Sequence, residues 1–401
     1  MRVLVTTTPG LGHIHPLVPF AQALQTAGHE VAFASTATGA QVIEASGFAC
    51  FQTGVDKTVF EIGAELGVDV ARLTREARLR FMVRHYFAGT HTAERARDIL
   101  DVVQLWSPDL VVREQSDYAG CAAAEAAGLP YATVEVLARG RSPEMVAMIA
   151  EGLDDIRAAV GLAPDPGHAM LTRHLVLSPF PPSFRSPDAA APPTLRSVRP
   201  APFDRSGTEA LPGWVADLPE DRAVVYATLG TTSNFRPDVF EAIITGLRDE
   251  PLSLIATVGR DRDPAAFGAQ PRSVRIERYV PQSLLFPKVH LVVCHGGSGT
   301  VSLALDHALP MVIIPLGADM PRNAAGAQVA GVARVIEPQD ATPAAIRVAA
   351  RAVLDNPSYR DAARRVQEEL RALPPLEYSI ELLERLVRGA VFVESKPGQS
   401  L

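Results

Sequence analysis

Short apolar runs alternate along this chain with segments in which apolar residues recur every three or four positions. Residues 3–7, 110–114, 223–227 and 291–294 are such runs, and each leads through a turn-forming stretch into a segment with helical spacing. Apolar runs of this length are typical of buried strands, and strands that alternate with helices favour parallel sheets. The pattern therefore predicts an α/β chain of doubly wound, Rossmann-like units.

The same pattern covers most of the chain. We expect strands at residues 3–7, 30–34, 110–114, 223–227, 252–257, 274–276, 291–294 and 311–314. We expect helices at residues 15–27, 121–127, 143–160, 343–354, 359–373 and 376–388, and a mixed, mainly helical region at 55–105. In the first helix, Pro16 suits the opening turn and Gly28 suits the C-terminal cap.

Residues 177–219 are rich in proline. Because proline cannot continue a helix or a central strand, this segment is expected to contain a connection between domains. A chain of 401 residues is long enough for two domains, each with its own core. We therefore expect an N-terminal domain at 1–205 that ends in the Pro-rich connection, a C-terminal domain at 206–375, and a last helix and tail at 376–401.

Composition and charge narrow the class of protein. The net charge of −7 argues against a nucleic-acid partner, whose phosphates need a basic face. The three cysteines, Cys50, Cys121 and Cys294, are far apart in apolar sequence, as is typical of reduced core thiols. The chain enters its first strand without a signal peptide, and no apolar run approaches the ~20 residues of a membrane span. We expect a soluble, cytoplasmic protein without a membrane span.

A glycine-rich turn separates the apolar run at 291–294 from the helical spacing at 301–305. The turn consists of His295, Gly296, Gly297, Ser298, Gly299 and Thr300. Glycines let backbone N–H groups approach an anion, and a helix N-terminus adds unpaired donors and roughly +0.5 of a charge. The turn is thus a candidate phosphate site, although a strand-to-helix turn without a ligand has the same appearance.

Two common nucleotide-binding classes do not fit. The turn at 295–300 is not followed by Gly-Lys-Ser/Thr, which excludes a P-loop. Near the N-terminus, Gly10 and Gly12 begin a dinucleotide fingerprint, but His15 stands in place of its third glycine. The second strand also ends without the acidic residue that would bind a ribose. An NAD-dependent enzyme is therefore a poor interpretation.

Two further polar segments follow apolar runs on either side of the glycine-rich turn. The first is Tyr279-Val280-Pro281-Gln282 and the second is Asp319-Met320. In a parallel sheet, consecutive strand ends open onto one crevice, so these segments and the turn are expected to share it.

The block at 278–323 resembles the nucleotide-sugar site of family 1 glycosyltransferases of the GT-B fold, in particular bacterial enzymes that attach deoxysugars to natural products. In that family an aromatic-X-Pro-Gln segment packs the nucleobase, a His-Gly-Gly-X-Gly-Thr turn holds the diphosphate, and an Asp-Gln pair binds sugar hydroxyls. The resemblance implies two Rossmann-like domains facing a central cleft and a C-terminal helix that crosses back to the first domain. The strand at 223–227 and the glycine turn after it resemble the family's second phosphate-facing loop. The donor-binding residues implied are Gly12, Thr231, Tyr279, Val280, Gln282, His295, Gly296, Gly297, Ser298, Gly299, Thr300, Asp319 and Met320, of which Met320 departs from the family's Gln.

Transfer of a sugar to a hydroxyl needs a base for the acceptor proton. His13 is our candidate, because it stands at a strand-to-helix turn where the helix N-terminus disfavours the imidazolium, and because Gly10-Leu11-Gly12-His13-Ile14-His15-Pro16 matches the family's Gly-X-Gly-His-X-X-Pro motif. The resemblance gives the orienting acid as Glu114, at the end of the strand 110–114, with Asp117 as the second choice.

Aromatic and methionine residues in the mixed helical region are expected mostly in the core, with some of them lining an acceptor pocket. The predicted acceptor-binding residues are Phe60, Phe81, Met82, Tyr86 and Met145, whereas Leu66, Leu79 and Phe87 count as apolar bulk. Asp261-Arg262-Asp263 spells a metal-binding Asp-X-Asp, but it lies in a polar loop before Pro264 and offers few carboxylates. We expect no metal and no cofactor, with a dTDP-sugar as co-substrate.

The donor can be argued from Leu303. Plant-type members of the family have a ribose-binding Glu at this position, and an aliphatic group gives a 2′-OH no partner, which favours dTDP over UDP. Met320 removes a further polar group, which suits a deoxysugar. The prediction is an inverting transferase with an apolar natural-product acceptor. A nucleotide-sugar epimerase of the same fold and a non-catalytic helper protein remain alternatives, and homodimer formation is left open.

Overall fold

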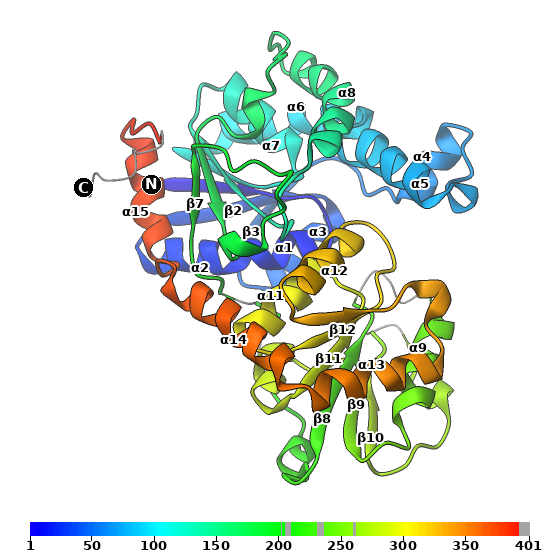
Figure 1. Cartoon of the computed structure of the whole chain (residues 1–401). Helices are drawn as coiled ribbons and strands as arrows, with labels where there is room; N and C mark the ends of the chain where they lie inside the picture. Colours follow the sequence, from blue (N-terminus) through cyan, green and yellow to red (C-terminus); the bar gives the residue numbers. More distant parts are fainter. Residues whose placement is uncertain (202, 205–209, 231–235, 260–261, 393–401) are drawn as a thin grey trace. The chain divides into compact units, whose positions relative to one another are not determined.

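The structure is a computed structural model, and it describes all residues except 202, 205–209, 231–235, 260–261 and 393–401 (Figure 1). The chain forms two compact units. The N-terminal unit contains Met1–Pro179, Ser186–Ala201 and the residues from Leu373 onward. The C-terminal unit contains Phe180–Arg185 and Pro202–Ala372.

The N-terminal unit is built on a seven-stranded parallel sheet in the order β3-β2-β1-β4-β5-β6-β7. Its strands are β1 (Arg2–Thr6), β2 (Glu30–Ser35), β3 (Ala49–Gln52), β4 (Leu110–Glu114), β5 (Tyr131–Val134), β6 (Leu175–Ser178) and β7 (Leu195–Ser197). Every residue of the central strand β4 is buried, as expected for a parallel strand covered on both faces. The register of β1 against β4 pairs Thr6 with Arg113, which brings the segment after β1 beside Glu114.

Helices cover both faces of this sheet. The helices of the unit are α1 (Leu11–Ile14), η1 (His15–Leu17), α2 (Val18–Thr26), α3 (Ala37–Ala45), α4 (Val59–Glu65), η2 (Val70–Arg72), α5 (Arg75–Phe81), η3 (Met82–Phe87), α6 (Thr90–Trp106), α7 (Tyr118–Ala126), α8 (Pro143–Ala159), η4 (Ala169–Leu171) and α15 (Tyr378–Val387). Helices α6, α7 and α8 pack together on one face, opposite α2 and α3 (Figure 1). Their apolar sides form the main core of the unit with β1, β4 and β5.

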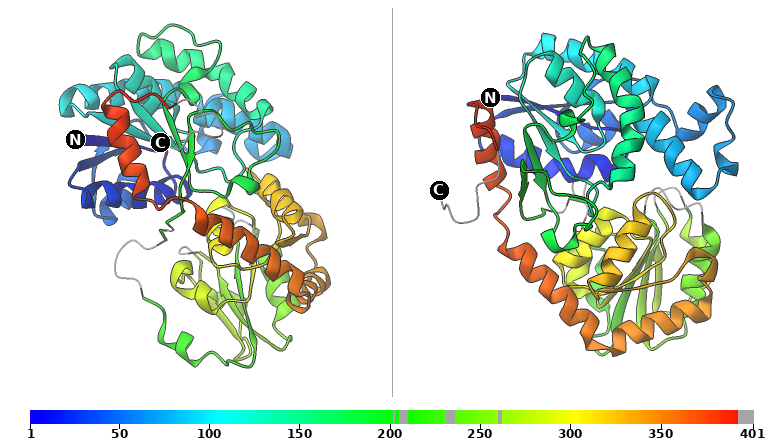
Figure 2. Two further views of the ribbon diagram at one scale, coloured as in Figure 1. Left: turned by 60° about the vertical axis from the view of Figure 1, so that its left-hand side comes forward. Right: turned by 45° about the horizontal axis from the view of Figure 1, so that its top comes forward.

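The last helix, α15, belongs to the N-terminal unit although it follows the whole C-terminal unit in sequence (Figure 2). It packs against α2, and His29 Nε2 lies 3.1 Å from Glu384 Oε1. The expected return of the C-terminal helix to the first unit is thus confirmed.

The C-terminal unit is built on a six-stranded parallel sheet in the order β10-β9-β8-β11-β12-β13. Its strands are β8 (Ala223–Thr228), β9 (Leu252–Thr257), β10 (Val274–Glu277), β11 (Leu291–Cys294), β12 (Met311–Ile313) and β13 (Ala333–Val335). Its helices are η5 (Pro182–Phe184), η6 (Gly213–Asp217), α9 (Pro237–Leu247), η7 (Pro264–Phe267), α10 (Gln282–Leu285), η8 (Phe286–Lys288), α11 (Ser298–Asp306), α12 (Met320–Val329), η9 (Pro338–Asp340), α13 (Pro343–Asp355) and α14 (Pro357–Ala372).

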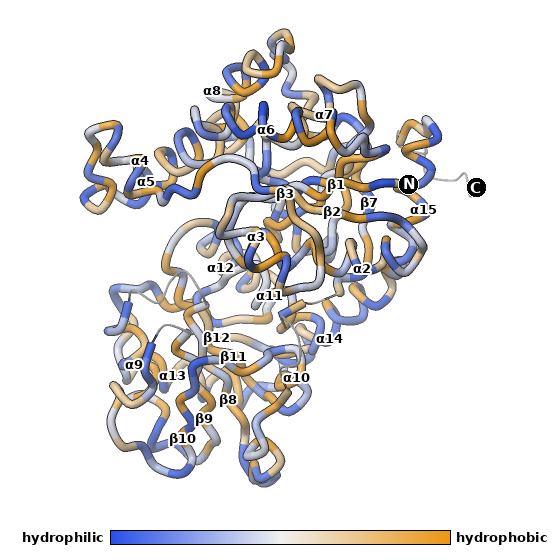
Figure 3. The backbone as a smooth tube through the Cα atoms, turned by 180° about the vertical axis from the view of Figure 1, so that it is seen from behind, coloured by the Kyte–Doolittle hydropathy of each residue, from blue (hydrophilic) through white to orange (hydrophobic). Residues whose placement is uncertain are grey.

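Helices in both units carry hydrophilic and hydrophobic residues in alternation (Figure 3). In α13, for example, Ile346, Ala349, Ala350 and Val353 are buried, a spacing that places them on one face. Two Rossmann-like α/β units with parallel sheets confirm the predicted fold class.

Some predicted elements need correction. The elements that the sequence pattern did not predict are the helices α3, α9 and α12 and the strands β3, β5, β6, β7 and β13, and each of these strands has only three or four residues, too few for a clear period. The first helical segment begins at Leu11 instead of His15, because Gly10 already acts as its N-cap with φ 118°. Leu177 and Ser178 end the interior strand β6, so the Pro-rich segment does contain part of a central strand; its first proline, Pro179, comes only after that strand.

Among the described residues, none of the helices combines the length and the apolar character needed to cross a membrane. Cys121 and Cys294 are buried free thiols, and Cys50 is a half-buried one. Burial raises the pKa of Cys50 and Cys121 to about 11, which keeps both protonated near neutral pH.

Candidate active site

In the N-terminal unit, His13 lies beside Glu114. His13 is the third residue of α1, directly after the Gly10 turn that follows β1. Its Nδ1 lies 3.1 Å from Glu114 Oε1; the His13 side chain is 25% exposed, whereas that of Glu114 is 0% exposed. The β1–β4 pairing therefore brings together a partly accessible imidazole and a fully buried carboxylate.

Neighbouring donors hold the Glu114 carboxylate in place. The Thr8 hydroxyl donates a hydrogen bond of 3.0 Å to Oε1, and the Ser116 backbone N–H donates one of 2.8 Å to Oε2. Burial by itself would raise the pKa of Glu114, but the attraction of His13 and these hydrogen bonds outweigh it and lower the pKa below its ordinary value. A charged carboxylate favours the His13 tautomer with its proton on Nδ1, which leaves Nε2 able to accept one.

Asp117, the second choice for the orienting acid, has another partner. Its carboxylate lies 2.7 Å from Arg95 Nη1, and it also accepts the Gly120 backbone N–H at 3.3 Å, which caps α7. Arg95 in turn donates to the carbonyls of Thr7 at 2.9 Å and Ala34 at 3.1 Å. This buried ion pair ties the ends of β1 and β2 to α7, so that it fixes the turn on which His13 stands.

The five predicted acceptor-binding residues lie on α4, α5, η3 and α8 of the N-terminal unit. Phe81 and Tyr86 belong to a small cluster with Ile62 and Val70, and Met145 packs against the main core. Met82 is half-buried at the start of η3, and Phe60 is 57% exposed on α4.

Phe87, which the sequence analysis counted as bulk, contacts His13. The two ring centroids are 5.5 Å apart with a tilt of 44°. No sequence signal singled it out, because its position depends on the π-helical turn η3, and apolar periodicity does not reveal such a turn.

In the C-terminal unit, the glycine-rich turn joins β11 to α11. Gly296 has φ +88°, and a Cβ there would lie 2.9 Å from Ile313 Cγ2. A Cβ on Gly230 or Gly297 would lie 2.5 or 2.6 Å from His295 Nε2. Glycine is therefore required at these positions by close approach, and the imidazole is wedged between two backbone segments.

His295 is 6% exposed. Burial lowers its pKa to about 4, so the ring is neutral near pH 7. Within the part of the chain that the structure describes, its Nδ1 has no hydrogen-bond partner. A buried polar atom without a partner is costly, and a ligand at the N-terminus of α11 could accept a hydrogen bond from such a ring.

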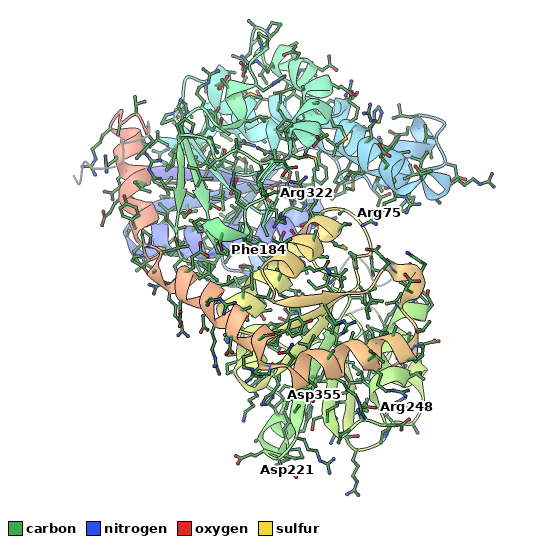
Figure 4. All side chains as sticks on the ribbon, in the orientation of Figure 1. Arg75, Phe184, Asp221, Arg248, Arg322 and Asp355 are labelled. Carbon is green, nitrogen blue, oxygen red and sulfur yellow. The ribbon has the colours of Figure 1, made fainter. Side chains whose placement is uncertain are left out.

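Asn323 connects the turn to Asp319. Its side-chain amide donates to the Gly296 carbonyl at 2.9 Å, to Ser298 Oγ at 3.1 Å and to Asp319 Oδ2 at 2.8 Å. Ser298 Oγ also donates to Asp319 Oδ2 at 2.7 Å. The label of Arg322 in Figure 4 marks this part of α12, because Arg322 directly precedes Asn323.

No role was predicted for Asn323, although it stands four residues after Asp319, the N-cap of α12, a spacing that brings the two side chains together. Asp319 and Ser298, predicted to bind the donor, are thereby held beside each other. Thr300 and Gly299 lie in the first turn of α11, and Met320 opens α12 as a buried residue.

The predicted nucleobase segment follows β10. Tyr279 lines an open hollow of about 440 Å³ together with Pro264, Glu277 and Arg278. The Tyr279 hydroxyl donates to the Asp204 carbonyl. Val280 is fully buried, and Gln282 Nε2 donates to the Tyr226 hydroxyl at 3.2 Å.

Two predicted donor residues remain. Gly12 lies in α1 of the N-terminal unit, next to His13. Thr231 lies outside the described residues. No group of three or more His, Cys, Asp or Glu side chains that could hold a metal ion occurs among the residues described. Asp263 accepts the Ala265 backbone N–H at 3.2 Å and so caps η7.

Comparison with known proteins identifies the chain's relatives. The model for the N-terminal domain of erythromycin biosynthesis protein CIII-like proteins matches residues 22–230, and the model for their C-terminal domain matches residues 252–386. The 10-deoxymethynolide desosaminyltransferase of Streptomyces venezuelae is 29% identical over 427 residues, covering 96% of this chain and 97% of that protein.

Solved structures of glycosyltransferases have a similar fold. The crystal structure of the glycosyltransferase VinC in complex with dTDP has a TM-score of 0.78 and 27% identity, covering 97% of this chain and 100% of VinC. That of the glycosyltransferase SnogD from Streptomyces nogalater has a TM-score of 0.74 and 26% identity, covering 96% and 99% of the two chains.

Two Rossmann-like units with a glycine-rich turn in the second and a returning C-terminal helix define a glycosyltransferase of the GT-B fold. The chain belongs to the erythromycin biosynthesis protein CIII-like family, whose two domain models cover most of its length. It is an enzyme, a glycosyltransferase of the antibiotic deoxysugar type. The alternatives of an epimerase and a non-catalytic helper are thereby set aside.

Proposed function

We propose that this enzyme is an inverting, metal-independent glycosyltransferase that moves a deoxysugar from a dTDP-sugar to a hydroxyl of an apolar natural product. The observation that carries the proposal is the contact of 3.1 Å between His13 Nδ1 and the fully buried carboxylate of Glu114. An imidazole oriented in this way is suited to act as a general base.

In the proposed reaction, His13 Nε2 takes the proton of the acceptor hydroxyl while the acceptor oxygen forms a bond to C1 of the sugar. The bond between C1 and the diphosphate oxygen breaks with its electron pair, and dTDP leaves. Attack opposite the leaving group inverts the configuration at C1. Glu114 stabilises the imidazolium that forms, and the N-terminus of α11 with His295 stabilises the diphosphate.

The donor assignment rests on Leu303 and Met320. Leu303 is 4% exposed within α11, and an aliphatic side chain there offers a ribose 2′-OH no hydrogen bond. The relative VinC was solved with dTDP, which supports the same nucleotide here. Met320 is an apolar residue beside Asp319, which suits a sugar with fewer hydroxyls.

The test compares His13→Gln with a matched control, His15→Gln, in the adjacent helical turn. Release of dTDP from a dTDP-deoxysugar is followed with a panel of hydroxylated macrolactone and aromatic polyketide acceptors. We expect His13→Gln to reduce turnover by ~10²–10⁴ with dTDP affinity by calorimetry within a few-fold, and His15→Gln to stay near native. Near-native turnover of His13→Gln would overturn the base assignment.

Two further measurements test the inversion at C1 and the independence from metal ions. Proton NMR of the product should show the anomeric configuration opposite to that of the donor; retention would exclude inversion. Turnover should be unchanged after treatment with EDTA, and a loss that Mg²⁺ or Mn²⁺ restores would contradict metal independence.

A further inference from the structure

The turn η3 (Met82–Phe87) is a π-helical turn between α5 and α6. The Ala88 backbone N–H donates to the Val83 carbonyl at 3.0 Å, a hydrogen bond across five residues. One extra residue per turn shifts the direction of the following side chains by roughly 100° compared with a regular helix. The direction in which Phe87 points is therefore set by this turn.

A side chain of the turn itself and contacts from α6 and α8 hold the end of the turn. Arg84 Nη1 donates to the Ala88 carbonyl at 3.1 Å, and Thr92 Oγ1 donates to the Phe87 carbonyl at 2.9 Å. A Cβ on Gly152 of α8 would lie 1.9 Å from the Ala88 carbonyl oxygen, so only glycine lets α8 approach so closely. Contacts from α6 and α8 thus fix the backbone of Phe87.

The fixed ring of Phe87 packs against the main core and against the imidazole of His13, at 5.5 Å between centroids. Glu114 contacts His13 at Nδ1, so the imidazole is held by a carboxylate through one nitrogen and by an aromatic ring. We propose that Phe87 is a positioning residue that keeps the His13 ring in the orientation in which Nδ1 faces Glu114. This inference rests on the proposed role of His13 as the base.

The charged and titratable groups around this contact come from β4, α6, η3 and the N-cap of α7. Glu114 of β4 faces His13 directly, and Arg95 of α6 is paired with Asp117 beneath the turn. Tyr86 of η3 has its pKa raised by burial and by nearby carboxylates, and it therefore stays neutral near pH 7. Glu114 contacts the ring as a charged group and Phe87 contacts it as an apolar one, so loss of the Phe87 ring changes the orientation of the imidazole without removing a charge.

The experiment uses Phe87→Leu, with Phe87→Tyr as the conservative variant. The control is Phe51→Leu, because Phe51 is also half-buried against the same core but contacts Trp106, at 6.0 Å between centroids. The ¹⁵N chemical shifts of the His13 ring, assigned by comparison with His13→Gln, report the tautomer in the full chain without any substrate.

We expect the native ring and Phe87→Tyr to hold the proton on Nδ1, and Phe87→Leu to show a mixture of tautomers. Turnover of Phe87→Leu should fall roughly ten- to hundred-fold through misorientation, with unchanged dTDP affinity. Phe51→Leu should stay within two-fold of native, on the order expected for a distant core change. A native tautomer and native turnover in Phe87→Leu, or an equal loss in Phe51→Leu, would overturn the proposal.

The same set separates this inference from the proposed function. If His13→Gln retains turnover, the base assignment fails, and the ¹⁵N shifts of Phe87→Leu still decide whether Phe87 orients the ring. If His13→Gln is inactive and Phe87→Leu keeps the native tautomer, only the positioning role fails. In the His13→Gln background, Phe87→Leu should cause no additional loss of turnover, because the two changes act on one group.

Discussion

The burial of His295 predicts that the C-terminal unit loses stability in mild acid. The ring is 6% exposed, wedged against Gly230 and Gly297, and its pKa falls from an ordinary value of 6.5 to about 4 because of desolvation. Above pH 6.5 the ring is neutral in both the folded and the unfolded chain. As the pH falls from 6.5 toward 4, the unfolded chain takes up a proton that the folded unit does not, so folding becomes less favourable.

The magnitude follows from the two pKa values. The difference between the two pKa values of His295 corresponds to about 3 kcal/mol in the free energy of unfolding. About 2.5 kcal/mol of this stability should be lost between pH 7.5 and pH 4.5. The perturbation is His295→Gln, which cannot take up the proton. The variant should therefore lose less stability than the native protein over this pH range, by about that amount.

The assay is urea unfolding followed by tryptophan fluorescence. The chain has two tryptophans, of which Trp106 lies in the N-terminal unit and Trp214 in the C-terminal unit, so a Trp106→Phe background reports on the latter alone. His307→Gln is the control, since His307 is only half-buried in the same unit and should give a smaller difference. Equal pH dependence of native and His295→Gln proteins would refute the desolvation argument.

Three further outcomes follow from the contacts described. Arg95→Met should destabilise the N-terminal unit by about 3–5 kcal/mol in thermal or urea unfolding, because it leaves Asp117 buried and unpaired, and adding Asp117→Asn should restore part of the loss. Asn323→Ala should weaken dTDP binding by about 1–3 kcal/mol in calorimetry with little change in melting temperature, and an unchanged affinity would show that Asn323 does not order the glycine-rich turn. In competitive binding dTDP should exceed UDP by at least about ten-fold, and Leu303→Gln, which adds a polar group without a buried charge, should narrow that preference; equal affinities in the native enzyme would remove the argument for dTDP.

Much of the fold could be read from the chain because its signals are local. The strands β4, β9 and β11 coincide with the predicted apolar runs, since each contains three or four consecutive apolar residues, as is typical of buried parallel strands. The helices α8 and α13 agree with their predictions within one residue, because both open with a proline that suits the first helical turn. Short edge elements such as β13 carry too few residues for a period to show.

For the candidate site, too, some features follow from the local sequence and others from the tertiary packing. The sequence determined that a histidine stands on a glycine turn after the first strand, and that a second glycine-rich turn joins a buried strand to a helix. Both are consequences of backbone conformation within a few residues. Whether Glu114 or Asp117 faces His13 was decided by the tertiary structure: the register of β1 on β4 brings Glu114 to the imidazole, whereas the contact with Arg95 occupies Asp117.

The tertiary structure also determines the surroundings of Phe87, His295 and Asn323. Phe87 reaches His13 only through a π-helical turn fixed by neighbouring helices, and Asn323 meets Gly296 only because α12 packs beside the turn before α11. His295 is neutral because two glycines from different strand ends close on its ring. Local sequence determines which chemical groups stand at the ends of strands, but their direction, burial and partners depend on contacts between segments far apart in the chain, which only the packed sheet and its helices determine.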